Sequence, residues 1–408
     1  MRIVQKYGGT SVGSLERIEA VADRVAKTVQ AGNECAVVVS AMGKTTDQLV
    51  ELAKGLTNKP DARELDALLS TGEQVSAALL SMALHKRNIT AKSYTGWQAG
   101  IETEAIHGTA RMTNVRTEFL EQALKDGIVP VVTGFQGIAG DSVTTLGRGG
   151  SDTTAVVIAA ALDADVCEIY TDVTGVFTTD PRTVPNARKI KSLQHEEMLE
   201  LATLGAQVLH PRAVENAKKF SVRLVVKSSF SEEEGTEIVA DLEGLELQKP
   251  VTGIATEKSV ARIAVVGVPV NRHGLAKMFS KLAEERVNVD VIVQSVVKER
   301  VVDVSFTVQE QDVDEALAVV EGLRTELGFE DVIKESGLAK ISIVGAGMIS
   351  NPGVAGEMFE ILASADVTIK MVSTSEIKVS CIIPASQLAT AVSSVHSAFL
   401  EGVLSGSK

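Results

Sequence analysis

Cysteine, aromatic residues and long apolar runs are all scarce in this 408-residue chain. Cys35, Cys167 and Cys381 are isolated, and each lies in or beside an apolar run, so we expect buried free thiols rather than a disulfide framework. The six histidines show no metal-ligand spacing, and we predict no protein metal site. No apolar run approaches the ~20 residues of a membrane span, and the first residues lack the apolar core of a signal peptide. These absences favour a reduced, cytoplasmic protein.

Clusters of basic residues are also lacking, and the formal net charge is −13. Nucleic acid and anionic membranes are therefore not expected as partners. Aromatic residues make up only 3% of the chain but hydrophobic residues 45%, a balance typical of α/β layers built from aliphatic side chains. The length predicts two or three domains.

The first part of the chain alternates short apolar runs with helical patterns. Strands are expected near residues 3–6, 36–40, 128–133, 166–171 and 223–226. Helices are expected near residues 15–29, 63–87, 114–126, 153–163 and 195–219, with Ser14 as the N-cap of the first. This alternation predicts a mainly parallel sheet with helices on both faces, and ligands outside the carboxyl ends of its strands.

An internal repeat occupies the last part of the chain. Residues 261–267 match 339–345, and residues 287–289 match 367–369. Each copy predicts a βαββαβ unit, and two such units side by side offer an interface for a small ligand. Residues 231–259 are acidic and less periodic than the rest, and we place the boundary between the two parts there.

Four clusters point to phosphate chemistry, each weakly when taken alone. They are residues 6–11 (Lys-Tyr-Gly-Gly-Thr-Ser), 40–47, 146–154 (Leu-Gly-Arg-Gly-Gly-Ser-Asp-Thr-Thr) and 171–182. Glycines permit close approach of the backbone to phosphate oxygens, and a helix N-terminus attracts anions. The second cluster lacks the upstream glycine of a P-loop, so that interpretation is rejected. Residues 345–347 lack the third glycine of a dinucleotide fingerprint, and the internal repeat explains this strand better.

Taken together and in this order, the clusters and the repeat resemble the amino-acid kinase family, specifically its aspartokinase branch. The resemblance covers nearly the whole chain. It implies a three-layer αβα sandwich over residues 1–247, followed by two ferredoxin-like βαββαβ ACT domains over 260–335 and 336–408. It also implies that Mg-ATP, as co-substrate and without a prosthetic group, phosphorylates the side-chain carboxylate of L-aspartate. That reaction gives 4-phospho-L-aspartate and opens lysine, threonine and methionine biosynthesis.

The resemblance assigns roles to individual residues. The catalytic residues would be Lys6 and Asp152. The ATP-binding residues would be Lys6, Tyr7, Gly8, Gly9, Ser11, Thr171, Asp172, Phe177, Asp180, Arg182 and Gln207. The residues that bind aspartate would be Ser40, Thr46, Glu73, Arg148 and Ser151. The sequence departs from the family pattern at Gln207, where a lysine is usual, and at Phe177, where a tyrosine is common.

Regulation by end products is a further implication of the resemblance, with lysine, threonine or both as inhibitors. The effector residues would be Asn271, Gly274, Ala276, Gln294, Val354, Ala355, Thr368, Ile369 and Ser375. The first copy reads Asn-Arg-His-Gly over 271–274, where Asp-x-Pro-Gly is usual. ACT pairs of this type imply a homodimer or higher oligomer, and some relatives also make a separate ACT-only subunit.

Other interpretations remain open at this point. The chain also fits a sister kinase that acts on another acceptor, or an amino-acid sensor whose kinase domain has decayed. Taken without the resemblance, Glu73 is a solvated helix residue and Asp152 only an N-cap. His107 and His210 are expected to be structural because no partner for them is evident in the sequence.

Overall fold

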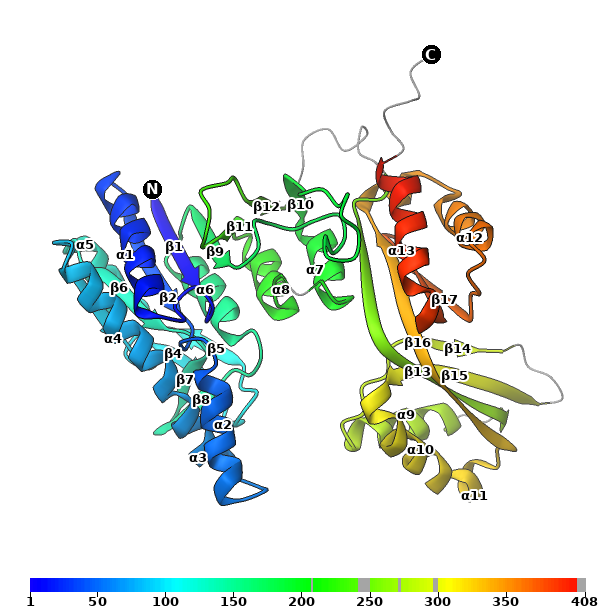
Figure 1. Cartoon of the computed structure of the whole chain (residues 1–408). Coiled ribbons are helices and arrows are strands. Elements are labelled where there is room, and N and C mark those ends of the chain that lie inside the picture. The colour runs from blue at the N-terminus through cyan, green and yellow to red at the C-terminus, as the bar shows by residue number, and fades with distance from the viewer. Residues whose placement is uncertain (207, 241–249, 271–272, 296–299, 402–408) are drawn as a thin grey trace, which may run out of the picture. The chain divides into compact units, whose positions relative to one another are not determined.

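The computed structural model describes residues 1–206, 208–240, 250–270, 273–295 and 300–401 (Figure 1). Its contacts divide the chain into two compact units. The first unit contains Met1–Phe177, Lys189–Thr203 and Gln207–Gly244. The second contains Thr178–Arg188, Leu204–Ala206 and Leu245–Lys408. A short segment from the middle of the sequence, 178–188, therefore packs with the C-terminal half of the chain.

The first unit is built on an eight-stranded sheet with the order β10-β12-β11-β9-β1-β2-β6-β3. Its strands are β1 (Arg2–Tyr7), β2 (Glu34–Val39), β3 (Ala91–Tyr94), β6 (Val129–Thr133), β9 (Val166–Thr171), β10 (Ser192–Gln194), β11 (Leu224–Ser228) and β12 (Thr236–Val239). All neighbours are parallel except β11 and β12. The expected parallel sheet is confirmed, with an antiparallel change near one edge.

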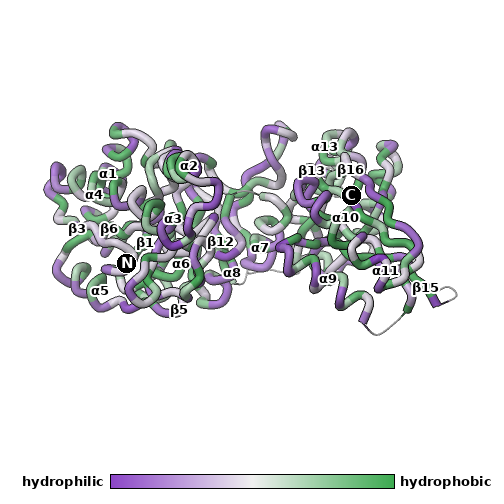
Figure 2. The backbone as a smooth tube through the Cα atoms, turned by 90° about the horizontal axis from the view of Figure 1, so that it is seen from below, coloured by the Kyte–Doolittle hydropathy of each residue, from purple (hydrophilic) through white to green (hydrophobic). Residues whose placement is uncertain are grey.

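Helices cover both faces of this sheet, as expected. They are α1 (Leu15–Gln30), α2 (Thr45–Leu56), α3 (Ala62–Leu69), α4 (Thr71–His85), α5 (Glu118–Lys125), α6 (Gly150–Ala161), α7 (His195–Thr203) and α8 (Pro211–Phe220). The buried side chains of α1 and α4 form one core with alternate residues of β2, such as Val37 and Val39. Ser14 caps α1 as predicted, since its Oγ accepts from Arg17 N at 3.3 Å. The alternation of hydrophobic and hydrophilic residues can be followed along the tube in Figure 2.

Several expected helices are divided or shifted in the structure. The pattern over 63–87 is two helices, α3 and α4, which meet at Ser70. The pattern over 195–219 is also two helices, and the segment 114–126 holds the end of a strand and the short helix α5. Within the described residues, one helical stretch, Ala62–His85, is long and apolar enough to span a membrane, but half of its most apolar window is buried inside the protein.

A small second sheet completes the first unit, with the order β5-β4-β7-β8. Its strands are β4 (Ile101–Thr103), β5 (Met112–Val115), β7 (Gln136–Ala139) and β8 (Ser142–Thr145). The hairpin β7–β8 leads directly into the glycine-rich turn before α6. This small sheet therefore positions the glycine-rich turn that the sequence analysis identified.

The second unit contains one six-stranded sheet, β14-β15-β13-β16-β18-β17. Its strands are β13 (Gly253–Pro269), β14 (Ile292–Gln294), β15 (Val301–Gln309), β16 (Asp331–Val344), β17 (Met371–Thr374) and β18 (Lys378–Pro384). Its helices are α9 (Gly274–Glu284), α10 (Val313–Gly322), α11 (Arg324–Leu327), α12 (Val354–Ser364) and α13 (Leu388–His396), with short turns η2 (Glu310–Asp312) and η4 (Ala385–Gln387). Each copy of the repeat has its own hydrophobic core.

The two copies share their long strands. Residues 253–257 of β13 pair with 340–344 of β16, in the second copy. Residues 262–266 of β13 pair with 331–335 of β16, in the first copy. Each long strand thus belongs to both copies, and the repeat forms one continuous antiparallel sheet.

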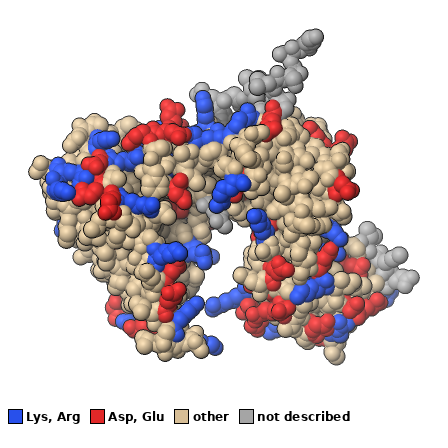
Figure 3. All heavy atoms as spheres, viewed as in Figure 1, with Lys and Arg blue, Asp and Glu red and all other residues tan. Residues whose placement is uncertain are grey.

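Acidic and basic side chains are intermixed over the visible face of each unit in Figure 3. The three cysteines are buried free thiols, as predicted. Burial raises the pKa of the Cys381 thiol to about 12, which makes a thiolate unfavourable at neutral pH.

Candidate active site

The candidate site lies at the carboxyl ends of the parallel strands in the first unit. Backbone hydrogen bonds continue past these ends and hold the following loops together. Gly8 N donates to Tyr170 O at 3.2 Å, Ser40 N to Tyr7 O at 3.0 Å, and Gly134 N to Val39 O at 2.9 Å. The loops after β1, β2 and β6 are therefore adjacent, as the parallel sheet predicts.

Lys6 and Asp152 form an ion pair at this edge. Lys6 Nζ lies 2.5 Å from Asp152 Oδ1, and the two side chains are only 10% and 13% exposed. Lys6 is the penultimate residue of β1, and Asp152 lies in the first turn of α6. The positive end of the helix dipole stabilises the carboxylate there. The structure therefore brings the two predicted catalytic residues together.

The glycine-rich turn starts α6 earlier than the apolar pattern indicates. The helix begins at Gly150, and its N-cap is Gly149 with φ +68° rather than Asp152. The reading of Asp152 as an N-cap is therefore wrong. An added Cβ on Gly149 would come within 2.1 Å of the His210 ring, so the position requires glycine for both its conformation and its packing.

Ser151 also lies against glycine. An added Cβ on Gly134 would be 2.6 Å from Ser151 Oγ. The loop after β6 and the start of α6 thus touch closely enough to exclude any side chain at Gly134. Arg148 is exposed in the turn and forms no hydrogen bond or ion pair with the described part of the chain.

Glu73 is buried, so its interpretation as a solvated helix residue is wrong. The side chain on α4 is 3% exposed, and its Oε1 accepts from Ala41 N at 3.3 Å. Its Oε2 is buried without a hydrogen-bond partner among the described residues. Burial raises the pKa of Glu73 to about 7, although the backbone N–H groups of Glu73 and Ala41 oppose this shift. A carboxyl group in this state is suited to a cationic ligand that would pair with it.

Two further polar groups were given no role by the sequence interpretation, which only placed Thr133 at the carboxyl end of an expected strand. Thr133 Oγ1, at the end of β6, and Gln136 Oε1, at the start of β7, are buried and also lack hydrogen-bond partners within the described segments. Gln136 Nε2 donates to Ser70 O at 2.8 Å, which fixes the amide beside the N-terminus of α4. Native proteins satisfy most buried polar atoms, so three such groups in one region indicate a place for a polar ligand.

Asp66 is another residue that the sequence interpretation missed. It is 1% exposed on α3, and its carboxylate accepts from Gly108 N, from Thr145 N and from His107 Nδ1 at 2.8–3.1 Å. The expectation that His107 has no partner is therefore wrong. Because Thr145 ends β8, this carboxylate anchors the strand that leads into the glycine-rich turn. The only signal in the sequence was an acidic residue on the apolar face of a short helical pattern.

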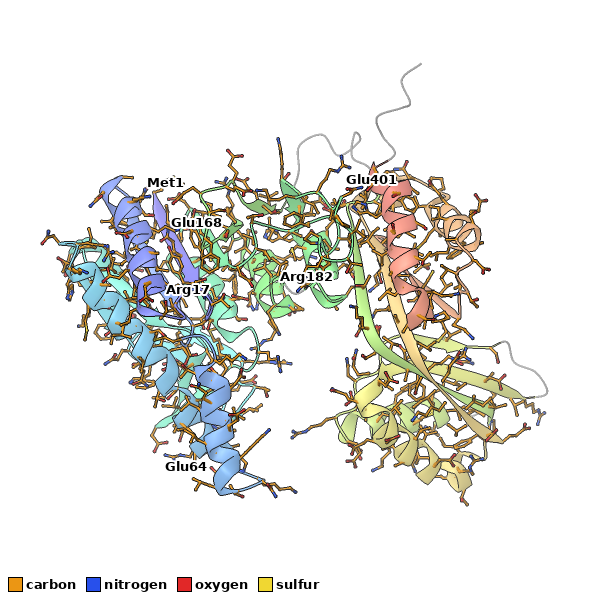
Figure 4. All side chains as sticks on the ribbon, viewed as in Figure 1. Met1, Arg17, Glu64, Glu168, Arg182 and Glu401 are labelled. Atoms are coloured by element: carbon orange, nitrogen blue, oxygen red, sulfur yellow. The ribbon has the colours of Figure 1, made fainter. Side chains whose placement is uncertain are left out.

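Tyr7 and Ser11 are held on the core side of the first loop. The Tyr7 ring is fully buried and stacks on Tyr170 with centroids 4.8 Å apart. Below it, Glu168 (labelled in Figure 4) accepts from Gln5 Nε2 at 2.8 Å and pairs with Lys227 at 2.5 Å. Any contact of Tyr7 with a nucleotide would use its backbone. The hydroxyls of Ser11 and Ser229 are 2.5 Å apart.

The remaining predicted site residues lie in loops or in the second unit. Ser40 and Thr46 are half-buried, after β2 and at the start of α2. Thr171 Oγ1 donates to Asp172 Oδ1 at 3.1 Å after β9. Asp180 and Arg182 belong to the second unit, where the Arg182 guanidinium pairs with Asp180 at 2.9 Å and lowers the pKa of that carboxyl. Phe177 is half-buried and bridges to Lys189, while Gln207 lies outside the described residues.

The predicted effector residues fall in equivalent places in the two copies. Gly274 is the first residue of α9, and Val354 is the first residue of α12. Gln294 ends β14, and Thr368 N donates to Gln387 Oε1 at 3.0 Å. Asn271 lies outside the part of the chain that the structure describes. Among the described residues no group of three or more His, Cys, Asp or Glu side chains is placed to hold a metal ion.

Comparison with known proteins decides the family. The amino acid kinase family matches residues 1–228, and an aspartokinase from Bacillus sp. (strain MGA3) is 54% identical over 97% of both chains. The chain belongs to the aspartokinases. An ACT domain also matches twice, over residues 263–322 and 341–399. Aspartokinase 2 of Bacillus subtilis is 53% identical, again over 97% of both chains.

Solved aspartokinases have the same fold. E. coli aspartokinase III in complex with aspartate and ADP (R-state) has a TM-score of 0.81 at 26% identity, covering 97% of this chain and 99% of that one. The same enzyme in complex with lysine and aspartate (T-state) has a TM-score of 0.76 at 26% identity, covering 98% and 99%. The expected architecture, an amino-acid kinase domain with two ACT domains, is thereby confirmed.

Proposed function

We propose that this aspartokinase transfers the γ-phosphoryl group of ATP to the side-chain carboxylate of L-aspartate, giving 4-phospho-L-aspartate. The observation that carries the proposal is the buried Lys6–Asp152 ion pair at the strand edge, in a chain that belongs to the aspartokinases. Crystals of E. coli aspartokinase III with aspartate and ADP support both substrates. The reaction would be the first step towards lysine, threonine and methionine.

Positioning and charge neutralisation would supply most of the rate. A carboxylate nucleophile is already ionised at pH 7, so the step requires no general base. Lys6 would neutralise the transferring phosphoryl group, while Gly8 and Gly9 approach it through their backbone N–H groups. Asp152 would hold Lys6 in place through the observed ion pair.

Aspartate would be held by both of its ends. Arg148 would form paired hydrogen bonds to the α-carboxylate, a geometry that suits a guanidinium group. Glu73 would pair with the α-ammonium through the carboxylate oxygen that lacks a partner. The hydroxyls of Ser40, Thr46 and Ser151 would complete the polar contacts.

The nucleotide would lie along the loops after β1 and β9. Its proposed contacts are Tyr7, Gly8, Gly9, Ser11, Thr171, Asp172, Phe177, Asp180, Arg182 and Gln207. Mg²⁺ commonly binds through nucleotide phosphates and one or two carboxylates, so the small number of acidic residues here, Asp152 first among them, fits Mg-ATP as a co-substrate.

Lysine, threonine or both would inhibit the enzyme through the ACT domains. Crystals of E. coli aspartokinase III with lysine support lysine as an effector. The proposed contacts are Asn271, Gly274, Ala276, Gln294, Val354, Ala355, Thr368, Ile369 and Ser375. We also propose a catalytic domain over 1–247, ACT domains over 260–335 and 336–408, a homo-oligomer, and a cytoplasmic location.

Trapping of the acyl phosphate tests this function. The full chain is incubated with Mg-ATP, L-aspartate and hydroxylamine, with and without lysine plus threonine. We expect a hydroxamate with aspartate, none with glutamate, and less product with the two effectors. A folded protein that forms no hydroxamate from aspartate but binds lysine or threonine would instead be a sensor. Equal product with glutamate would contradict the assigned acceptor.

A further inference from the structure

A cavity of about 370 Å³ opens inside the second unit, away from the predicted effector residues. It lies where β13 and β16 pass from one copy of the repeat to the other, beside helix α13. A cavity of this volume is within the range of small-molecule sites. None of the predicted effector residues lines this cavity, so it is a separate place.

The walls of the cavity are apolar on one side and polar on the other. Leu338, Leu388 and Val392, all from the second copy, supply the apolar side. The polar side carries two charges of opposite sign, Lys258 on β13 and Glu310 at the start of η2. Both side chains are exposed, and neither forms an ion pair or side-chain hydrogen bond with another described residue.

The backbone keeps this place open. Ser259 has φ +59° and Gly337 has φ +73°, and these two residues line the cavity where the strands change partners. A left-handed serine costs the fold some conformational energy. An added Cβ on Gly337 would meet nothing within 4 Å. The pairing register of β13 and β16 shifts at this point, between Glu257 and Val260.

We propose that this cavity binds a free α-amino acid with an aliphatic side chain. Lys258 would pair with the α-carboxylate and Glu310 with the α-ammonium, while the side chain lies on Leu338, Leu388 and Val392. The two charges, neither of which is in an ion pair, match the two charged groups of the ligand, and the apolar wall matches the rest of it. An anion or a cation alone would leave one of the two charges uncompensated.

A ligand bound in the cavity would change the contacts of the segment 178–188. Thr183 of this segment lines the cavity, and Val184 lies in the core of the second copy. Lys258 lowers the pKa of Asp180 through its charge, after the larger effect of Arg182. A carboxylate bound to Lys258 would weaken that interaction. This second step rests on the proposed nucleotide-binding role of Asp180 and Arg182.

Calorimetric titration of the full chain tests the site. L-valine, L-leucine, L-isoleucine and L-methionine are the ligands, with isobutylamine and isovalerate as singly charged probes. We expect one amino acid bound per chain, with at least tenfold weaker binding to the Lys258→Gln and Glu310→Gln variants. Ala389→Phe, which fills the cavity from α13, should abolish binding. Glu315→Gln, at an exposed position of α10, should bind the amino acid as the native chain does.

Either of two results would overturn the site. One is the absence of binding of all four amino acids at 10 mM, roughly the weakest range that calorimetry resolves. The other is binding that persists in Lys258→Gln, Glu310→Gln and Ala389→Phe, which would place the ligand elsewhere. Thermal unfolding of each variant, matched to the native chain, separates loss of the site from loss of the fold.

A kinetic measurement separates this inference from the proposed function. The KM for ATP and kcat are measured by hydroxamate formation with and without the bound amino acid. A change of at least threefold in the KM for ATP, absent in Lys258→Gln, supports the connection to the segment 178–188. An unchanged KM overturns that connection. If the chain forms no hydroxamate but still binds the amino acid, the proposed function fails and the site stands.

Discussion

Glu73 has a pKa of about 7 because it is buried, and this value makes aspartate binding depend on pH. The raised pKa keeps the free carboxyl protonated below pH 7, whereas pairing with an α-ammonium requires its ionised form. We therefore expect the KM for aspartate to rise as the pH falls from 8 to 6, by up to about tenfold per pH unit below the pKa. Steady-state kinetics across this range measures it.

Glu73→Gln is the matched variant for this effect. The amide keeps the size of the side chain but does not titrate in this range. Its KM for aspartate should be high and independent of pH between 6 and 8. A variant that keeps the pH dependence of the native chain would remove Glu73 from the explanation.

Lys6 and Asp152 are predicted to act as a unit at the reacting phosphoryl group. Lys6→Met should lower kcat by on the order of 10²–10³, as removal of one stabilising donor does elsewhere. Asp152→Asn should lower kcat as well, because the amide no longer holds the ammonium by charge. Hydroxamate assays measure both.

The exposed residue Asp163 offers a control. Asp163→Asn removes the same charge at the other end of α6 and should leave kcat unchanged. If Asp152→Asn and Asp163→Asn behave alike, the ion pair of Lys6 has no catalytic importance.

At this scale the sequence predicted more of the site's residues than of their environments. Lys6, Asp152 and Glu73 were identified, but the burial of Glu73 was not. Thr133 and Gln136 were given no role because a single polar residue at the end of an apolar strand looks like the start of a loop. Whether such a residue is buried depends on α4 and α6, which come from other parts of the chain.

At the scale of elements, the packing at the start of α6 predicts how two glycine substitutions differ in their effect on stability. Gly149→Ala adds a methyl group that strains the left-handed backbone and collides with the His210 ring. Gly140→Ala is the matched control, since it has φ +64° and nothing within 4 Å of an added Cβ. Gly140→Ala should lower the free energy of unfolding by about 1 kcal/mol, and Gly149→Ala should lower it clearly more.

Denaturant unfolding and kinase assays distinguish these two variants. Gly149→Ala should also lower activity, because the turn positions Arg148 and Ser151. Equal effects of the two substitutions would mean that the packing of the turn against His210 is unimportant.

The long strands of the second unit show what a repeat leaves open. The match of residues 261–267 with 339–345 predicted two similar βαββαβ units, and the structure contains the repeat with the last strand of the second copy supplied by residues 253–257 of β13. It did not predict that 253–257, which precede the first copy, pair with the second copy. Pairing between distant strands depends on which strand edges remain free after the helices pack. Local sequence patterns therefore do not predict which strands will pair.

At the scale of the whole molecule, the segment 178–188 follows a strand of the first unit but packs in the second. Val184 is 6% exposed within the core of the second ACT copy. Val184→Ala should destabilise that copy by about 2 kcal/mol, from the lost apolar groups and the cavity left behind. Hydrogen exchange of the β18 and α13 amides should accelerate, while β1 and β2 remain unchanged.

Val270→Ala is the comparison, because Val270 lies in the second unit but is 54% exposed. It should leave exchange in β18 and α13 as in the native chain. If Val184→Ala accelerates exchange only in the first unit, the assignment of this segment to the second unit is wrong.

Two buried histidines, His195 and His396, favour unfolding in mild acid. Burial lowers the pKa values of His195 and His396 below the usual 6.5. His396 Nε2 bonds with Thr178 Oγ1 at 2.9 Å, and Glu401 and Arg188 act on it with opposite signs. At these two histidines the unfolded chain therefore binds more protons, so their contribution to stability is complete above pH 6.5 and declines as the pH falls below it. The raised pKa of Glu73 acts in the opposite direction in the first unit.

Thermal unfolding between pH 7.5 and 5.5 measures this decline. His396→Gln should reduce the decline in the second unit, since glutamine does not titrate. If His396→Gln made the decline towards pH 5.5 steeper than in the native chain, the sign assigned to His396 would be wrong.

The sequence by itself determined the fold class, the order of the parts and the residue types that bear the chemistry. It could do so because periodicity, glycine turns and charged motifs are local properties of the chain. Only the tertiary structure decided that Glu73 is buried, that Gly149 packs on His210, that the two ACT copies share strands, and that 178–188 belongs to the second unit. Each of these depends on contacts between residues far apart in sequence, whose free energy comes from burial and packing that no single segment encodes.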